Sequence, residues 1–97
     1  MKLRYTVAAL ADLSSILDYI AAHSPAGSIR VQTRLKVVID LTLTQPGIGV
    51  RTDDPAIRRL VALPYPYLVF YEPRANEIII HAIRHTSREV ARRQDET

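Results

Sequence analysis

Apolar residues recur along this chain with two different periods, which predict strands near both ends and two helices between them. Residues 2–6 form the first predicted strand, because apolar and polar side chains alternate there. Residues 7–23, and those from Pro25 to the break at 45–47, carry apolar side chains at helical spacing. The predicted buried residues are Leu10, Leu13, Leu17 and Ile20 in the first helix, and Val31, Leu35, Val38 and Thr42, widened by Ile39 and Leu43, in the second.

Residues typical of helix starts and turns mark the limits of these elements. Thr6 offers a side-chain oxygen as the first N-cap, and Ser24 does the same before Pro25, which suits the first turn of a helix. Residues 46–56 hold several glycines, prolines and aspartates and are expected to form a loop. Three more strands follow, separated by proline-containing turns, at residues 57–63, 67–72 and 77–85.

These elements predict an α+β fold in the order β-α-α-β-β-β. The joint between the helices is short, so we expect an antiparallel helical hairpin packed on one face of a largely antiparallel four-stranded sheet. The other face would be uncovered although the last two strands are apolar on both faces, so a partner is expected there. The 97 residues suffice for one domain, in which residues from about 90 onward form a polar tail.

Charge and composition narrow the functional class. Thirteen basic residues, eleven of them arginine, outweigh ten acidic ones and give a net charge of +3. Guanidinium groups suit contact with phosphate or carboxylate, although a GC-rich genome would produce the same bias. The absence of cysteine excludes disulfides and thiolate metal sites. With no apolar run long enough for a membrane span and no signal-peptide pattern, we expect a cytoplasmic protein that does not associate with membranes.

Several motifs, in order along the chain, resemble the RelE/ParE superfamily of type II toxin-antitoxin toxins. Those motifs are Asp12, Leu13 and Ile16 in the first helix, Pro46 and Gly49 in the following loop, Arg58-Arg59-Leu60, the stretch from Pro66 through Tyr67 and Tyr71 to Glu72, and residues 77–80 with Ile83, followed by an H-x-x-R motif at His85 and Arg88. The resemblance covers nearly the whole chain and implies the same β-α-α-β-β-β fold.

What the resemblance implies about activity depends on the branch. RelE-type toxins cut mRNA on the ribosome, whereas ParE-type toxins poison DNA gyrase. At the position where the RelE-type pattern resembles an arginine position, this sequence has Leu68. No tyrosine follows Tyr71 in the chain, so a C-terminal catalytic tyrosine is absent as well. Both departures favour a ParE-like gyrase inhibitor over an enzyme. A ribosome-dependent endoribonuclease, and a degenerate member that acts only in antitoxin binding and autorepression, stay open as alternatives.

The resemblance also implies partners. A cognate antitoxin, itself a small DNA-binding protein, would fold a disordered segment across the toxin. Operator DNA would be contacted only through that antitoxin, and gyrase would be the target. No cofactor or metal is expected, because carboxylates and histidines show no clustered ligand spacing.

The candidate residues for target or partner binding come from the last three predicted strands and the segment after them. They are Arg58, Arg59, Tyr67, Tyr71, Arg84, His85 and Arg88. No catalytic residue is assigned to a gyrase inhibitor. A nuclease would use His85 as general acid or base, because the arginines (Arg84, Arg88, Arg58 and Arg59) stay protonated and can only bind. The tyrosines are also expected to pack the sheet.

The two histidines of the last strand have different expected roles. Strict alternation predicts that His81 and His85 share one face with Ile79 and Ile83. We expect His81 to be hydrogen-bonded and partly buried, with no catalytic role. For His85 a structural role, bonding the neighbouring loop, and a functional role stay open. Arg92 and Arg93 are expected to be solvated.

Overall fold

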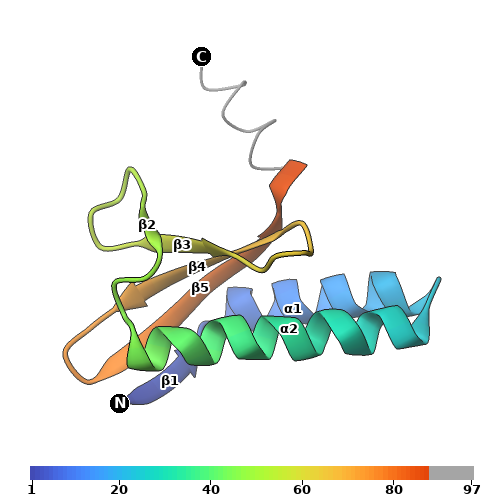
Figure 1. The fold of residues 1–97 in the computed structure, drawn as a ribbon, viewed down its shortest axis with the longest axis horizontal. Helices are drawn as coiled ribbons and strands as arrows, with labels where there is room; N and C mark the ends of the chain where they lie inside the picture. Colours follow the sequence, from blue (N-terminus) through green and yellow to red (C-terminus); the bar gives the residue numbers. More distant parts are fainter. Residues whose placement is uncertain (88–97) are drawn as a thin grey trace.

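The computed structural model describes residues 1–87, so Arg88, Arg92, Arg93 and the predicted tail lie outside the described residues. The elements follow the predicted order with one addition (Figure 1). They are β1 (Lys2–Tyr5), α1 (Val7–Ala21), α2 (Pro25–Thr44), β2 (Val50–Arg51), β3 (Arg58–Val61), β4 (Tyr67–Pro73) and β5 (Glu77–His85).

Both helices begin at the predicted N-caps. The Thr6 hydroxyl accepts a hydrogen bond from the backbone N–H of Ala9 at 3.0 Å, and the Ser24 hydroxyl accepts one from Gly27 at 2.9 Å. Pro25 then fills the first position of α2, where its missing N–H has no partner to lose. The tight joint makes the helices an antiparallel hairpin, and the Ser28 hydroxyl donates to the carbonyl of Leu17 across it at 2.9 Å.

Replacing Ser24 with alanine should lower the free energy of unfolding by about 1 kcal/mol, because the first turn of α2 loses its side-chain acceptor. Denaturant unfolding followed by circular dichroism measures the change. Ser14→Ala, at an exposed position inside α1, is the matched control and should be neutral or slightly stabilising, since alanine is the better helix former. Equal losses in the two variants would contradict the capping role.

The sheet has five strands, in the order β1-β5-β4-β3-β2, where four were predicted. β1 pairs with β5 in parallel and the other pairs are antiparallel. The extra strand lies in the segment predicted as a loop, where Val50 pairs with Arg59 and Arg51 with Arg58. Two residues are too few to show an alternating pattern, so this strand could not be predicted from the sequence.

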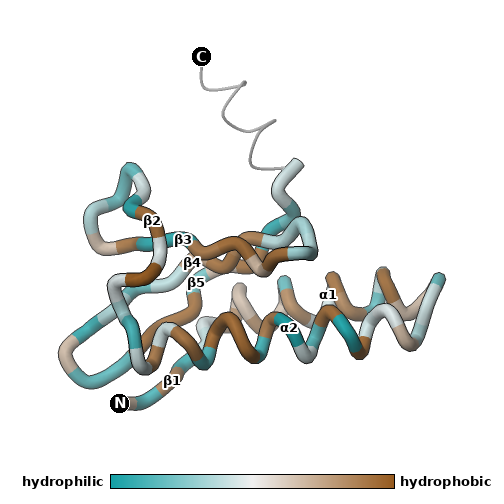
Figure 2. The backbone as a smooth tube through the Cα atoms, in the orientation of Figure 1, coloured by the Kyte–Doolittle hydropathy of each residue, from teal (hydrophilic) through white to brown (hydrophobic). Residues whose placement is uncertain are grey.

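The helical hairpin covers one face of the sheet, and brown hydrophobic segments of both layers face each other (Figures 1 and 2). The predicted stripe of α2 is confirmed, whereas Leu10 of α1 is 52% exposed and Ala9 is buried in its place. The core consists of Ala9, Val31, Leu35, Val38, Ile39, Ala62, Val69, Tyr71, Ile78, Ile80 and Ile83. No helix within residues 1–87 is long and apolar enough to cross a membrane.

An extra residue in β5 changes which side chains share a face. Phe70 pairs with Ala82 and Tyr71 with Ile80, so His81 is left between two pairs as a bulge. The predicted alternation is therefore wrong beyond His81, because a one-residue insertion moves every later side chain to the other face. Ile83 joins Ile80 in the core, and His85 follows on that same helix side.

Candidate functional site

The sheet face away from the helices carries an apolar strip with an arginine toward each end. We call it the open face. Cross-strand pairing assigns to it Val61, Leu68, Phe70, Ala82, Arg59 and Arg84, all of them only partly buried. This combination of apolar and cationic groups suits a partner that supplies both apolar side chains and carboxylates.

Arg59 and Arg84 are separated on the open face. They lie two strands and two residues apart in the register, which corresponds to roughly 12 Å between their Cα atoms, since the strand spacing contributes about 9.6 Å and the rise about 6.6 Å. At that separation the two guanidinium groups can also contact two different anionic groups of an extended partner.

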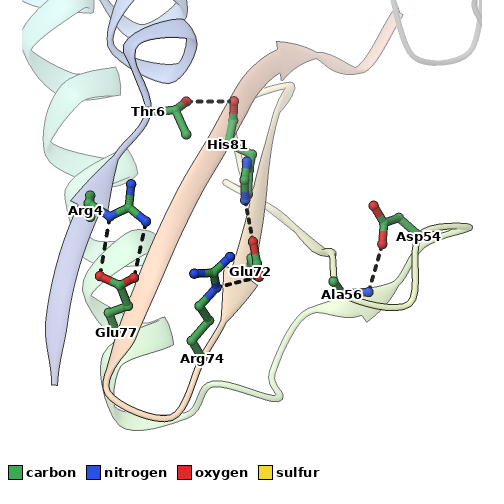
Figure 3. Close-up of polar contacts among 8 residues, drawn as sticks. All are labelled: Arg4, Thr6, Asp54, Ala56, Glu72, Arg74, Glu77 and His81. Atoms are coloured by element: carbon green, nitrogen blue, oxygen red, sulfur yellow. Dashed lines mark hydrogen bonds and ion pairs between the residues drawn. The ribbon is translucent and has the colours of Figure 1, made fainter.

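Two separate groups of ionic contacts lie toward the β1 end of the sheet (Figure 3). The Glu72 carboxylate is 2.7 Å from Arg74 Nε and 2.8 Å from His81 Nε2, and Arg4 pairs with Glu77 at 3.2 Å. The hydrogen bond from Arg74, and then that from His81, lowers the pKa of Glu72. The His81 ring is hydrogen-bonded and partly buried, as expected; the absence of a catalytic role stays a prediction.

Replacing Glu72 with glutamine should remove a small acid-sensitive part of the stability. The pKa of Glu72 is lowered from its ordinary value of 4.5, so the carboxylate stabilises the fold above about pH 4.5 and less as pH falls through the lowered pKa. The contacts are near solvent, which limits the effect to no more than about 1 kcal/mol. Urea unfolding near pH 7 and pH 3 tests this. The difference in the free energy of unfolding between wild type and E72Q should shrink at the lower pH. A difference that stays constant would contradict the prediction.

Two of the candidate binding residues hold the loop between α2 and β2. Tyr71 is fully buried; its hydroxyl donates to the Pro46 carbonyl and accepts from the Gly49 N–H, both at 2.8 Å. Arg58 donates to the carbonyls of Gly47 at 3.3 Å and Gly49 at 2.8 Å. In this conformation the Tyr71 side chain is inaccessible to a partner, and the guanidinium of Arg58 is occupied within the chain.

Tyr67, the first residue of β4, pairs with His85, the last residue of β5, and both side chains lie on the helix side of the sheet. Their rings are stacked edge to face with centroids 5.4 Å apart. The Nδ1 atom of His85 accepts from the Ser87 N–H at 3.1 Å and lies 2.8 Å from the Ser87 hydroxyl. A neutral His85 therefore carries its proton on Nε2, and its other nitrogen orders the chain just after the strand.

Asp12 of α1 has a role that sequence reasoning did not identify. Its carboxylate accepts a hydrogen bond from the Ile83 N–H at 3.0 Å. β1 ends before it reaches Ile83. The Thr6 N–H donates to the Ile80 carbonyl at 3.0 Å, and the Thr6 hydroxyl donates to the His81 carbonyl at 3.3 Å. Asp12 thus satisfies an edge group of β5 that no strand reaches. In the sequence, the only sign of this role was the family-like Asp-Leu pair. The contact between α1 and β5 explains why an aspartate stands at this position.

The described candidate residues therefore occupy three places. Arg58 and Tyr71 hold a loop, Arg59 and Arg84 lie on the open face, and Tyr67 and His85 lie beside α1 in a groove that Arg84 also lines. Arg58 and Arg59 are neighbours in the sequence but point to opposite faces of the sheet. Within residues 1–87, no group of three histidine, aspartate or glutamate side chains could hold a metal ion.

Comparison with known proteins identifies the family. The family model described as the ParE toxin of the type II toxin-antitoxin system parDE matches residues 3–90. Toxin RelE2 of Caulobacter vibrioides is 38% identical over 84 residues, which cover 87% of this chain and 93% of that protein. The structure of the chromosomal ParDE TA system from P. aeruginosa matches with a TM-score of 0.75 at 24% identity, over 88% of this chain and 95% of that one. That match confirms the α+β fold, and the chain belongs to the ParE toxin family of type II toxin-antitoxin systems, within the RelE/ParE superfamily.

Proposed function

We propose that this toxin acts by binding and that its target is DNA gyrase. One observation carries the proposal. Strand pairing places His85 on the helix side of the sheet and the side chains of Arg59 and Arg84 on the open face. A gyrase inhibitor needs a shaped binding surface, and nothing in that function requires these groups to meet.

Metal-free RNA cleavage has stricter requirements. A general base, a general acid and a cation must surround one phosphate, each within about 3 Å of its reacting atom. Within residues 1–87, His85 is the candidate acid or base, and its Nδ1 is engaged by Ser87. Arg58, which could have clamped the phosphate, is bonded to loop carbonyls. Together with the uncharged Leu68 on the open face, this arrangement supports an inhibitor over a nuclease.

The decisive experiment runs two reactions beside each other with purified, antitoxin-free toxin. Gyrase supercoiling of relaxed plasmid with ATP should be blocked or should yield trapped cleaved DNA, while mRNA in a translating-ribosome reaction stays intact. Cut mRNA with normal supercoiling would overturn the proposal, and His85→Ala would then have to abolish the cuts. If both reactions proceed undisturbed and expression leaves growth unchanged, the toxin is a degenerate member.

A type II toxin has a cognate antitoxin, and we propose that the antitoxin binds the open face. The strip formed by Val61, Leu68, Phe70 and Ala82 is only partly buried by the chain itself. A disordered antitoxin segment would gain most by placing apolar residues on this strip and carboxylates beside Arg59 and Arg84. Hydrogen-exchange protection at β4 and β5 on complex formation supports this placement, and protection confined to α2 would overturn it.

A further inference from the structure

A groove runs between α1 and the ends of β4 and β5, and Arg84 is the residue named for the open face that also lines it. It has a volume of about 590 Å³, in the range of sites that hold small molecules or single side chains. Its lining residues are Asp12, Ser15, Ile16, Tyr19, Tyr67, Ile83, Arg84, His85 and Ser87. The helical residues come from one side of α1, since they are spaced by three, four and seven.

The groove combines aromatic walls with a carboxylate. Tyr19 is 72% exposed and stacks on His23 with centroids 5.6 Å apart, so its ring stands at the edge of the groove. Burial, and then the nearby hydroxyl of Tyr19, raises the pKa of Tyr67, as expected if the two hydroxyls face the same space. Among residues 1–87, Asp12 makes no ion pair.

The α1 side of the groove has a charge opposite to that of the whole protein. The chain has a net charge of +3, yet no lysine or arginine occurs between Arg4 and Arg30, where Asp12 and Asp18 lie. Arg84 borders the groove, but it pairs with Leu68 and so directs its side chain to the open face. α1 is thus a locally acidic surface on a basic protein. This surface favours a cation beside the Asp12 carboxylate.

We propose that this groove binds an arginine side chain presented by a partner protein. A guanidinium group can stack on the rings of Tyr19 and Tyr67 and donate to the Asp12 carboxylate oxygen that is not bonded to Ile83. Its aliphatic portion would pack on Ile16 and Ile83. The groove lies mainly against α1, so this proposal does not depend on whether gyrase is the target.

The test uses the full chain, labelled with ¹⁵N, and a capped tripeptide Ala-Arg-Ala as the probe. Amide signals of Ser15, Tyr19, Ile83 and His85 should shift together and saturate at millimolar peptide. The same tripeptide with citrulline, an uncharged isostere of arginine, should bind at least about tenfold more weakly. Equal binding of the two peptides, or no shift with either, would overturn the proposal.

Matched variants assign the interaction to the groove. Asp12→Asn keeps an oxygen acceptor for the Ile83 N–H but loses the charge, and Tyr19→Ala removes an exposed ring, so each should weaken peptide binding about tenfold while the spectrum stays folded. Asp18→Asn removes an α1 carboxylate that does not line the groove and should leave affinity unchanged. Equal weakening by D18N would show nonspecific attraction and overturn the site. Tighter binding of adenosine monophosphate than of the arginine peptide would overturn the choice of ligand.

Discussion

Tyr71→Phe should lower the free energy of unfolding by about 1–3 kcal/mol, the usual cost of leaving buried polar groups without partners. The phenylalanine ring would fit the same space, so the loss isolates the hydroxyl. That hydroxyl joins the Pro46 carbonyl to the Gly49 N–H, each at 2.8 Å, inside a fully buried site. Without it, the N–H of Gly49 is buried with no acceptor. Chemical denaturation with a fluorescence or circular dichroism signal measures the change.

Tyr67→Phe is the matched control, because Tyr67 is partly buried and its hydroxyl faces the groove beside α1. It should change stability by no more than about 0.5 kcal/mol. If both variants lost the same stability, the loop contact of Tyr71 would have no special value.

Gly49→Ala tests the same contact from the other side. A Cβ at Gly49 would lie 2.7 Å from the Tyr71 ring and 2.8 Å from the carbonyl oxygen of Arg59. Neither neighbour is the free end of a flexible chain, so the loop must move, at about 1–3 kcal/mol. Gly47→Ala is the control, since a Cβ there meets nothing within 4 Å. A G49A protein as stable as G47A would mean that the loop is not held as the structure shows.

The order of helices and strands was predictable because each element repeats its pattern several times. α2, for example, buries every position of its predicted stripe except Leu43, which is partly buried against the core. The errors arose where a feature has no repeat. β2 is two residues long, and the bulge at His81 is a single inserted residue whose presence depends on how β4 pairs with β5. Leu10 was misplaced because Ala9, although small, lies on the side of α1 that approaches the sheet.

The candidate site was less predictable for a related reason. Residue type indicated that Arg58 and Arg59 could bind anions, but only the strand pairing shows that Arg58 turns to the loop carbonyls and Arg59 to the open face. Burial of Tyr71 depends on a loop 22 residues earlier in the chain. The groove beside α1 joins residues more than 50 positions apart, and no local sequence pattern reports such a meeting.

Reversing both charges of the open face, with Arg59→Glu and Arg84→Glu together, should raise the dissociation constant for the cognate antitoxin about 100-fold. Each reversal is expected to cost about 1.4 kcal/mol, or one factor of ten, since it sets a carboxylate against the acidic groups proposed for the partner. Isothermal titration at two salt concentrations measures the loss, which should be smaller at high salt.

The control for that double variant is Arg30→Glu with Arg51→Glu, which changes the net charge equally at exposed positions of α2 and β2. It should weaken the complex less than about threefold, because the acidic partner feels only the altered overall charge. Equal weakening by the two double variants would place the antitoxin elsewhere. The supercoiling assay then separates the two roles of the surface. If R59E/R84E still inhibits gyrase but escapes the antitoxin, the open face serves neutralisation alone, and gyrase must be bound through another part of the toxin.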